Sequence, residues 1–272
     1  MNNQIGTTGK AAFAGVPVDA KYVQWDGGLQ SDAIAVLSGP DGCIVSPTKV
    51  GYVVMTTDGP GLQRKFSAKQ RGEHKPAVVL CGSIDQLLEL ADVTPEIEAF
   101  YRDCVDRDIL MGCILPWKED ALSLIPDDQA VNLAMDSRGT SCFVVQFGTP
   151  SVQIAQHLWE MDHKLVFASS ANPSGKGNRG VVAGIGDRIE SEVDLIVTAD
   201  EYVASVQPDA SLETRYEQGV MVSFVDTLGR HRLDADQKPI PTLIRKGLDC
   251  DEIMTVLSSH FDAWDYRHGD YY

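Results

Sequence analysis

The feature that most constrains this sequence is a set of short apolar runs that do not alternate with polar residues. Residues 77–81, Ala-Val-Val-Leu-Cys, form the clearest run, and residues 43–45 form another. A strand that is buried on both faces has this continuous pattern, because neither of its faces meets water. The runs therefore predict a sheet that is covered by helices on its faces.

Segments with helical periodicity separate many of these runs. Leu29, Ala33 and Leu37 are spaced by four and share one face of a helix. We expect helices over residues 29–37, 62–70, 84–90, 95–105, 152–161 and 250–261. We expect strands over residues 43–45, 52–55, 77–81, 121–125, 142–147, 165–167, 194–197, 220–225 and 241–244. Because several strands follow one another with only loops between them, the sequence predicts an α/β fold with a twisted, mixed sheet.

The chain length limits the number of domains. The chain has 272 residues, and single domains extend to roughly 250–300 residues. We expect an N-terminal extension over residues 1–28, one α/β domain over residues 29–262 and a C-terminal tail over residues 263–272.

Neither a signal peptide nor a membrane span is expected. The first residues, Met-Asn-Asn-Gln-Ile-Gly-Thr-Thr-Gly-Lys, lack the apolar core of a signal peptide. No apolar run approaches the ~20 residues of a membrane-spanning helix. The six cysteines form no zinc motif, and several lie in apolar runs. The sequence therefore predicts a cytoplasmic protein with buried, reduced thiols and no membrane partner.

Positive charge is concentrated in one segment of an acidic chain. The formal net charge is −16, which disfavours RNA as a partner. Residues 64–75 nevertheless hold five Lys or Arg and one Glu, a net charge of +4 (5 − 1), so the rest of the chain sums to −20 (−16 − 4). Lys69 and Arg71 are of the types that bind phosphate oxygens. Cations at a helix C-terminus also stabilise its dipole, which would account for these two but not for all five.

A second candidate segment follows the strand expected at residues 165–167. It reads Ala-Ser-Ser-Ala-Asn-Pro-Ser-Gly and includes Ser170 and Asn172. Small residues at the end of a buried strand allow a ligand to approach the backbone, and Ser and Asn supply neutral donors. The same residue types also form ordinary turns. The sequence contains no Walker A motif, no zinc-protease motif and no serine-hydrolase elbow.

Taken in order, the candidate segments resemble the YrdC-like family of threonylcarbamoyl-adenylate synthases. The matching segments are Pro47-Thr48 with Tyr52, Lys69-x-Arg71, Ser170-Ala171-Asn172, and Ile244-Arg245-Lys246-Gly247. The resemblance spans roughly residues 28–260, and the Lys-x-Arg and Ser-Ala-Asn pair is its most specific part. It implies a YrdC-like open α/β fold.

The resemblance also implies an adenylate-forming enzyme that uses ATP or a related nucleotide, together with Mg²⁺ held mostly by ligand oxygens and water. The residues that would bind the nucleotide and its phosphates are Lys69, Arg71, Ser170, Asn172 and Arg245, with Lys69 and Arg71 also catalytic. The residues that would contact the second substrate, an amino acid or a carbamoyl or acyl donor, are Thr48, Lys49, Tyr52 and Ser223. No metal ligand is expected from the protein itself.

Several positions depart from the family pattern. The acidic residue after the first Thr is Lys49 here, the next Thr is Val50, and the Gly after Tyr52 is Val53. Residues 118–122, Lys-Glu-Asp-Ala-Leu, stand where the family has Pro-Gly-Pro-Leu-Thr. If Lys49 points inward, it would reverse the charge preference of the substrate pocket.

Three functions remain open from the sequence. The chain is a divergent relative that activates or transfers another carbamoyl or acyl group, a threonylcarbamoyl-adenylate synthase itself, or a non-catalytic module that binds a nucleotide or RNA. In each case the phosphate-facing residues are retained, whereas those facing the second substrate are changed.

Overall fold

The computed structural model describes residues 21–70, 75–126, 128–173, 175–211, 213, 214 and 216–267. In these residues one eleven-stranded sheet has the order β1-β8-β2-β3-β7-β4-β6-β5-β9-β10-β11. The strands are β1 (Tyr22–Gln24), β2 (Cys43–Thr48), β3 (Gly51–Thr56), β4 (Val78–Leu80), β5 (Met111–Pro116), β6 (Thr140–Val145), β7 (Val166–Ser170), β8 (Leu195–Thr198), β9 (Met221–Ser223), β10 (Thr242–Arg245) and β11 (Asp265–Tyr266).

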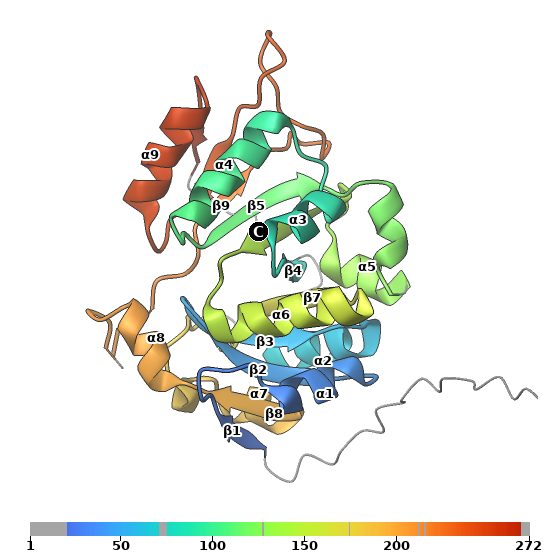
Figure 1. The fold of residues 1–272 in the computed structure, drawn as a ribbon, viewed down its shortest axis with the longest axis vertical. Coiled ribbons are helices and arrows are strands. Elements are labelled where there is room, and N and C mark those ends of the chain that lie inside the picture. Colours follow the sequence, from blue (N-terminus) through green and yellow to red (C-terminus); the bar gives the residue numbers. More distant parts are fainter. Residues whose placement is uncertain are drawn as a thin grey trace, which may run out of the picture.

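Helices flank this sheet (Figure 1). They are α1 (Ser31–Ser38), α2 (Gly59–Lys69), α3 (Ile84–Leu90), α4 (Pro95–Asp106), α5 (Asp128–Ala134), α6 (Thr149–Asp162), α7 (Asp187–Glu192), α8 (Asp200–Val206) and α9 (Cys250–His260), with short 3-10 helices at Asp120–Leu124 and Val182–Gly184. Neighbouring strands are parallel in some pairs, such as β4 and β6, and antiparallel in others, such as β2 and β3. The predicted α/β fold with a mixed sheet is therefore confirmed.

The sheet has a buried core on each face. On one face, Val79 and Phe143 pack in a cluster that includes Phe100 of α4. On the opposite face, Leu80 and Val144 belong to a cluster that includes residues of α1 and α6. Because successive strand residues point to opposite faces, the continuous apolar runs supply both clusters at once.

Helix α2 is fixed at both ends. The Asp58 side chain accepts a hydrogen bond from the Gly61 N–H at 2.8 Å and caps the first turn. At the other end Gln70 adopts a left-handed conformation with φ of 49°, and its N–H bonds back to the last turn. The two caps place Lys69 at a defined point at the end of the helix.

The structure corrects one predicted strand. Residues 121–125 lie mostly in the 3-10 helix, where Ala121 and Ile125 are buried and Leu122 is exposed. In a 3-10 helix residues three apart share a side, and Ala121 and Leu124 both pack at the core. A short, mostly apolar run does not distinguish this pattern from a strand. Strand β5 was not predicted from the sequence, because its Gly112 and Pro116 resemble turn residues.

Parts of the expected extension and tail belong to the sheet. Strand β1 pairs with β8, and β11 pairs with β10. The expected boundaries at residues 28 and 262 stay a prediction, and residues 1–20 and 268–272 lie outside the described residues. Every helix in the described part of the chain is too short or too polar to cross a membrane.

The buried thiols predict a loss of stability at alkaline pH. Five of the six cysteines are buried, and burial raises the pKa of Cys43, Cys104 and Cys142 to about 12. An unfolded cysteine has a pKa of about 8.5. Below that pH the thiol is protonated in both states, whereas above it unfolding releases protons. The free energy of unfolding should therefore fall by up to ~1.4 kcal/mol per pH unit for each buried thiol as pH rises from about 8.5 towards 12.

Urea unfolding at a series of pH values measures this effect. Cys104→Ala should make the free energy of unfolding fall less steeply with pH, by about 1.4 kcal/mol per pH unit, which is the contribution of one proton. Cys250→Ala is the matched control, because Cys250 is only partly buried. A free energy of unfolding that stays constant above pH ~9 would contradict the burial of these thiols.

Candidate functional site

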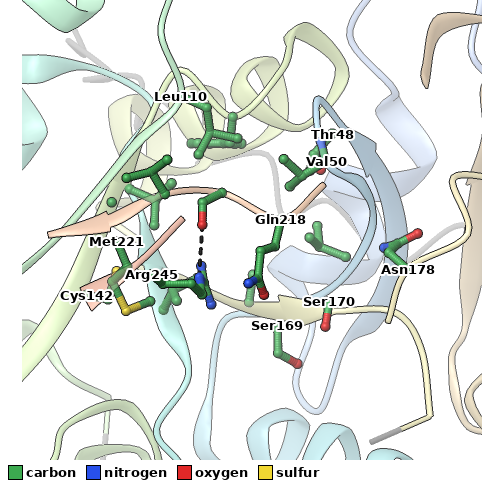
Figure 2. A pocket seen from close by; sticks show the side chains of 18 of the residues that line it. Thr48, Val50, Leu110, Cys142, Ser169, Ser170, Asn178, Gln218, Met221 and Arg245 are labelled. Atoms are coloured by element: carbon green, nitrogen blue, oxygen red, sulfur yellow. Dashed lines mark hydrogen bonds between the residues drawn. The ribbon is translucent and has the colours of Figure 1, made fainter. Parts of the chain in front are cut away.

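A cavity of about 610 Å³, here called the main cavity, lies along one face of the sheet. Residues from β3, β4, β5, β6, β7, β9 and β10 line it, together with residues at the end of α2 and in the loops after β7 and before β9. Figure 2 shows Arg245 beside Met221 and Cys142 at one end and Ser170 and Asn178 at the other, with Gln218 between them. Its volume lies in the range of about 300–1,000 Å³ that is usual for small-molecule sites.

A row of residues paired across adjacent strands forms an apolar floor. Leu80 on β4 pairs with Val144 on β6, which pairs in turn with Gly112 on β5. Gly112 pairs with Met221 on β9, and all four residues line the cavity. A Cβ atom on Gly112 would lie 3.1 Å from the sulfur of Cys142. A side chain at this position would press on its neighbours, so the centre of the floor fits a glycine closely.

The described lining of the main cavity carries charge of a single sign. Lys69, Lys75, Arg245 and Lys246 line it, and the described lining residues include no Asp or Glu. Since the whole chain has a net charge of −16, this concentration of cations does not follow from composition. A concave site lined by cations raises the local concentration of anions. The cavity is therefore suited to an anionic ligand.

Lys69 reaches the cavity from the last turn of α2. Its side chain is buried, with only 3% of the residue exposed. Its ammonium donates to the main-chain oxygen of Ser170 and lies 3.2 Å from the Ser170 hydroxyl oxygen. Since a buried ammonium must be hydrogen-bonded or paired, this contact holds the end of α2 against the end of β7. The predicted proximity of Lys69 and Ser170 is present in the structure.

Two asparagines in the loop after β7 differ in how their amides are used. Asn172 donates to the Pro173 oxygen at 2.8 Å, but its buried Oδ1 has no hydrogen-bond partner among the described residues. Asn178 is satisfied, because it donates to the Tyr52 oxygen at 2.6 Å and accepts from the Gly180 N–H at 2.9 Å. Buried polar atoms rarely lack a partner. Asn172 Oδ1 can therefore accept a hydrogen bond from a ligand, while Asn178 shapes the loop.

Arg245 enters the cavity at a β-bulge. The pairing of β10 with β9 shifts between Leu243 and Arg245, and Arg245 pairs with Met221. A bulge re-aims the side chains of a strand, so both Ile244 and Arg245 line the cavity. The Arg245 Nε donates to the Gly219 oxygen at 2.9 Å, which fixes the direction of the guanidinium.

Lys246 is a lining residue that sequence reasoning missed. Its ammonium lies 5.0 Å from the ring centroid of Tyr266, a distance at which a cation attracts an aromatic face. Tyr266 is held there because β11 pairs Tyr266 with Leu243 of β10. The position of Lys246 directly after Arg245 was the signal that could have indicated it.

Thr48 lines the cavity, but its hydroxyl is engaged in the turn between β2 and β3. It donates to the Gly51 oxygen at 2.6 Å and accepts from the Val50 N–H at 3.2 Å. The hydroxyl therefore stabilises the turn rather than presenting its hydrogen to a ligand.

Three other expected residues lie away from the main cavity. The Lys49 ammonium is 2.7 Å from Asp108 Oδ1 and lines a second cavity of about 460 Å³. Tyr52 is fully buried and donates to Asp200 Oδ1 at 2.6 Å. Ser223 is buried in β9 and does not line the main cavity. Lys49 therefore does not contribute its charge to the main cavity. It would have done so if its side chain pointed into that cavity.

The described structure thus brings together five of the nine expected residues. They are Thr48, Lys69, Ser170, Asn172 and Arg245. Arg71 lies outside the described residues. Residues 118–122, aligned by resemblance with a family motif, do not line the cavity, whereas Leu110 and Gly112 do.

Removal of the Lys69 ammonium should weaken the binding of an anion. Lys69→Ala should lower the affinity for inorganic pyrophosphate by roughly 10–100-fold, because a hydrogen bond to a charged group contributes about 1.5–3 kcal/mol. Isothermal titration calorimetry measures the effect. Lys238→Ala is the control, since it removes the same charge from an exposed lysine that does not line the cavity. Equal affinities for the two variants would contradict an anion site at Lys69.

The comparisons with known proteins identify the family. The family model Sua5_yciO_yrdC, described as "Telomere recombination", matches residues 39–215. No curated protein sequence matches the chain. A solved structure of a hypothetical protein, smu.1377c from Streptococcus mutans UA159, is 53% identical with a TM-score of 0.85, and the match covers 92% of this chain and 99% of that chain.

More distant solved structures share the fold. Sua5 of P. abyssi, complexed with L-threonine, is 16% identical with a TM-score of 0.57, and the match covers 86% of this chain and 58% of that chain. HypF, solved in a phosphate- and nucleotide-bound form, is 12% identical with a TM-score of 0.55, and the match covers 80% of this chain and 24% of that chain. From the family model and the fold, this chain belongs to the Sua5/YciO/YrdC family.

Proposed function

We propose that this chain is an enzyme that binds a nucleotide through its phosphates and activates or transfers an acyl or carbamoyl group in the main cavity. The observation that carries the proposal is the lining, in which four cationic residues and no described carboxylate surround an apolar floor. A nucleotide phosphate and a carboxylate or carbamate both match that charge.

Two neighbours support this choice of ligands. HypF was solved with phosphate and nucleotide bound, and Sua5 with L-threonine. In this chain, Lys69, Ser170 and Asn172 form the polar end of the cavity. We assign this end to the phosphates and the polar groups of the nucleotide.

The reaction that the family resemblance favours is the formation of an adenylate. A carboxylate or carbamate oxygen would attack the α-phosphorus of ATP and form a new P–O bond. The bond from that phosphorus to the oxygen bridging to the β-phosphate would break, and pyrophosphate would leave with the bonding electrons. Negative charge then grows on the phosphate oxygens, so the positioned ammonium of Lys69 would lower the barrier.

Mg²⁺ would enter with the nucleotide. The described lining of the cavity has no carboxylate, and carboxylates are the protein ligands that Mg²⁺ prefers. The described lining therefore offers no metal cage, and phosphate oxygens and water would supply the ligands. The role of this chain's residues is to hold the phosphates.

A second candidate is threonylcarbamoyl-adenylate synthesis itself. The observation in its favour is that Sua5, which shares the fold, was solved with L-threonine. The two candidates differ in the second substrate, so they are separated by which compound supports turnover.

Pyrophosphate release tests the proposal. The chain should release pyrophosphate from ATP and Mg²⁺ in the presence of a suitable carboxylate, and Lys69→Ala should slow this by roughly 100-fold, as removal of one charge-stabilising donor does. Lys238→Ala should retain the rate. Release only with bicarbonate and L-threonine would support the second candidate. Nucleotide binding without release from any substrate would indicate a non-catalytic module, and no nucleotide binding would refute the proposal.

A further inference from the structure

Two walls of the main cavity meet at the side chain of Gln207, which directly follows α8. One wall is the turn between β2 and β3, whose residues Thr48 and Val50 line the cavity. The other wall is the segment of residues 216–220 before β9, all of which line the cavity except Glu217. Gln207 does not line the cavity and is only 8% exposed. It can therefore act on a ligand only through these two walls.

The Gln207 carboxamide joins the two walls by three hydrogen bonds. Its Nε2 donates to the Lys49 main-chain oxygen at 2.9 Å and to the Glu217 main-chain oxygen at 3.3 Å. Its Oε1 accepts from the Glu217 N–H at 3.0 Å. A carboxamide has two donor hydrogens and one oxygen, so both hydrogens are used, one for each wall. Gln207 thus pairs with both main-chain polar groups of Glu217 and holds the turn with its remaining hydrogen.

Lys49 is the point at which the turn is held. Its N–H donates to the Phe147 oxygen at 2.9 Å, its main-chain oxygen accepts from Gln207, and its ammonium lies at Asp108. Three segments that are far apart in the sequence therefore fix the turn on which Thr48 and Val50 lie. Of these contacts, the one with Gln207 connects the turn to residues 216–220.

The second wall directs the guanidinium of Arg245. The Arg245 Nε donates to the Gly219 oxygen at 2.9 Å, which Figure 2 marks with a dashed line. The neighbouring Gln218 oxygen accepts from the Leu248 N–H at 2.9 Å. Both oxygens lie within two residues of Glu217, which Gln207 holds. A displacement of Glu217 would therefore be passed to Arg245 through the main chain.

We propose that Gln207 is a positioning residue of the main cavity. Its carboxamide sets the distance between the turn that joins β2 to β3 and the segment that directs Arg245, and it thereby fixes the shape of the Arg245 end. The Lys69 end is held through Ser170 of β7 instead. This inference rests on the proposed function, because it concerns how the same cavity holds its ligand. A group held in place by buried hydrogen bonds binds without first being ordered.

The first experiment measures ligand affinity by calorimetry on the full chain. The probe is an ATP analogue that cannot be cleaved between the α- and β-phosphates. Gln207→Met removes the three hydrogen bonds and keeps the length of the side chain. It should lower the affinity roughly 10-fold, because the Arg245 guanidinium would lose its fixed direction towards the anion. Gln156→Met is the matched control and should keep the affinity, because the Gln156 amide bonds only to Glu160 at the surface of α6.

A double-mutant cycle distinguishes positioning from a general loss of stability. If Gln207 acts through Arg245, Gln207→Met should change the affinity by less than about twofold once Arg245→Met is present. In the Lys69→Ala background it should keep its roughly 10-fold effect, because the Lys69 end is held by other contacts. A merely structural role would lower the affinity by the same factor in both backgrounds.

A measurement on the wild-type chain does not depend on the folding of any variant. Coupling between two equilibria is reciprocal, so a ligand that needs the two walls in place should in turn hold them there. Binding of the analogue should therefore slow the hydrogen exchange of the Glu217 and Leu248 amides. Their N–H groups bond to Gln207 and to Gln218, and they report whether the second wall is held.

The outcomes separate this inference from the proposed function. If the ATP analogue does not bind the wild-type chain, the proposed function is wrong and the inference falls with it. If the analogue binds, and Gln207→Met leaves the affinity unchanged or lowers it equally in both backgrounds, the proposed function stands and the role of Gln207 is overturned. Unchanged exchange of both amides on binding would overturn that role as well, even if Gln207→Met does not fold.

Discussion

The site depends on the position of one strand. Strand β7 lies between β3 and β4 and runs antiparallel to both. Its pairing places Ser170 opposite Val53 and Ala168 opposite Val78, and its central residues are fully buried. Because Lys69 bonds to Ser170 at the end of this strand, the sheet fixes the cationic end of the cavity relative to the floor. A shift in the register of β7 would move Ser170, and with it Lys69, relative to the floor of the cavity.

The opposite end of the cavity is fixed by the same sheet through different strands. Arg245 is placed by its pairing with Met221, by the bulge in β10 and by its bond to the Gly219 oxygen. Two cationic ends are therefore separated by an apolar row on rigid strands rather than on loops. Groups held by regular elements keep their geometry with little loss of entropy on binding. This arrangement favours two anionic groups bound at a set separation.

The sequence predicted the polar end of the site better than its floor. Lys69, Ser170 and Asn172 are polar residues at the ends of elements, where apolar periodicity stops, so they stand out. Gly112 and Met221 do not, because a strand that lines a cavity has the same apolar composition as a strand that lines a core. Tyr52 was misplaced for a related reason. Neighbouring strand residues face opposite sides, so Val53 faces the cavity and Tyr52 faces the core.

The charge of the cavity shows why orientation outweighs residue type. Lys49 stands where the family motif has an acidic residue, and an inward orientation would have added a fifth cation to the cavity. Its ammonium instead lies at Asp108, whose side chain is 75% exposed. The turn between β2 and β3 thus contributes neither a carboxylate nor a cation to the main cavity. Since no described lining residue is acidic, the four described cations of the lining attract anions. An apolar floor beside these cations favours an anion that also carries an apolar part.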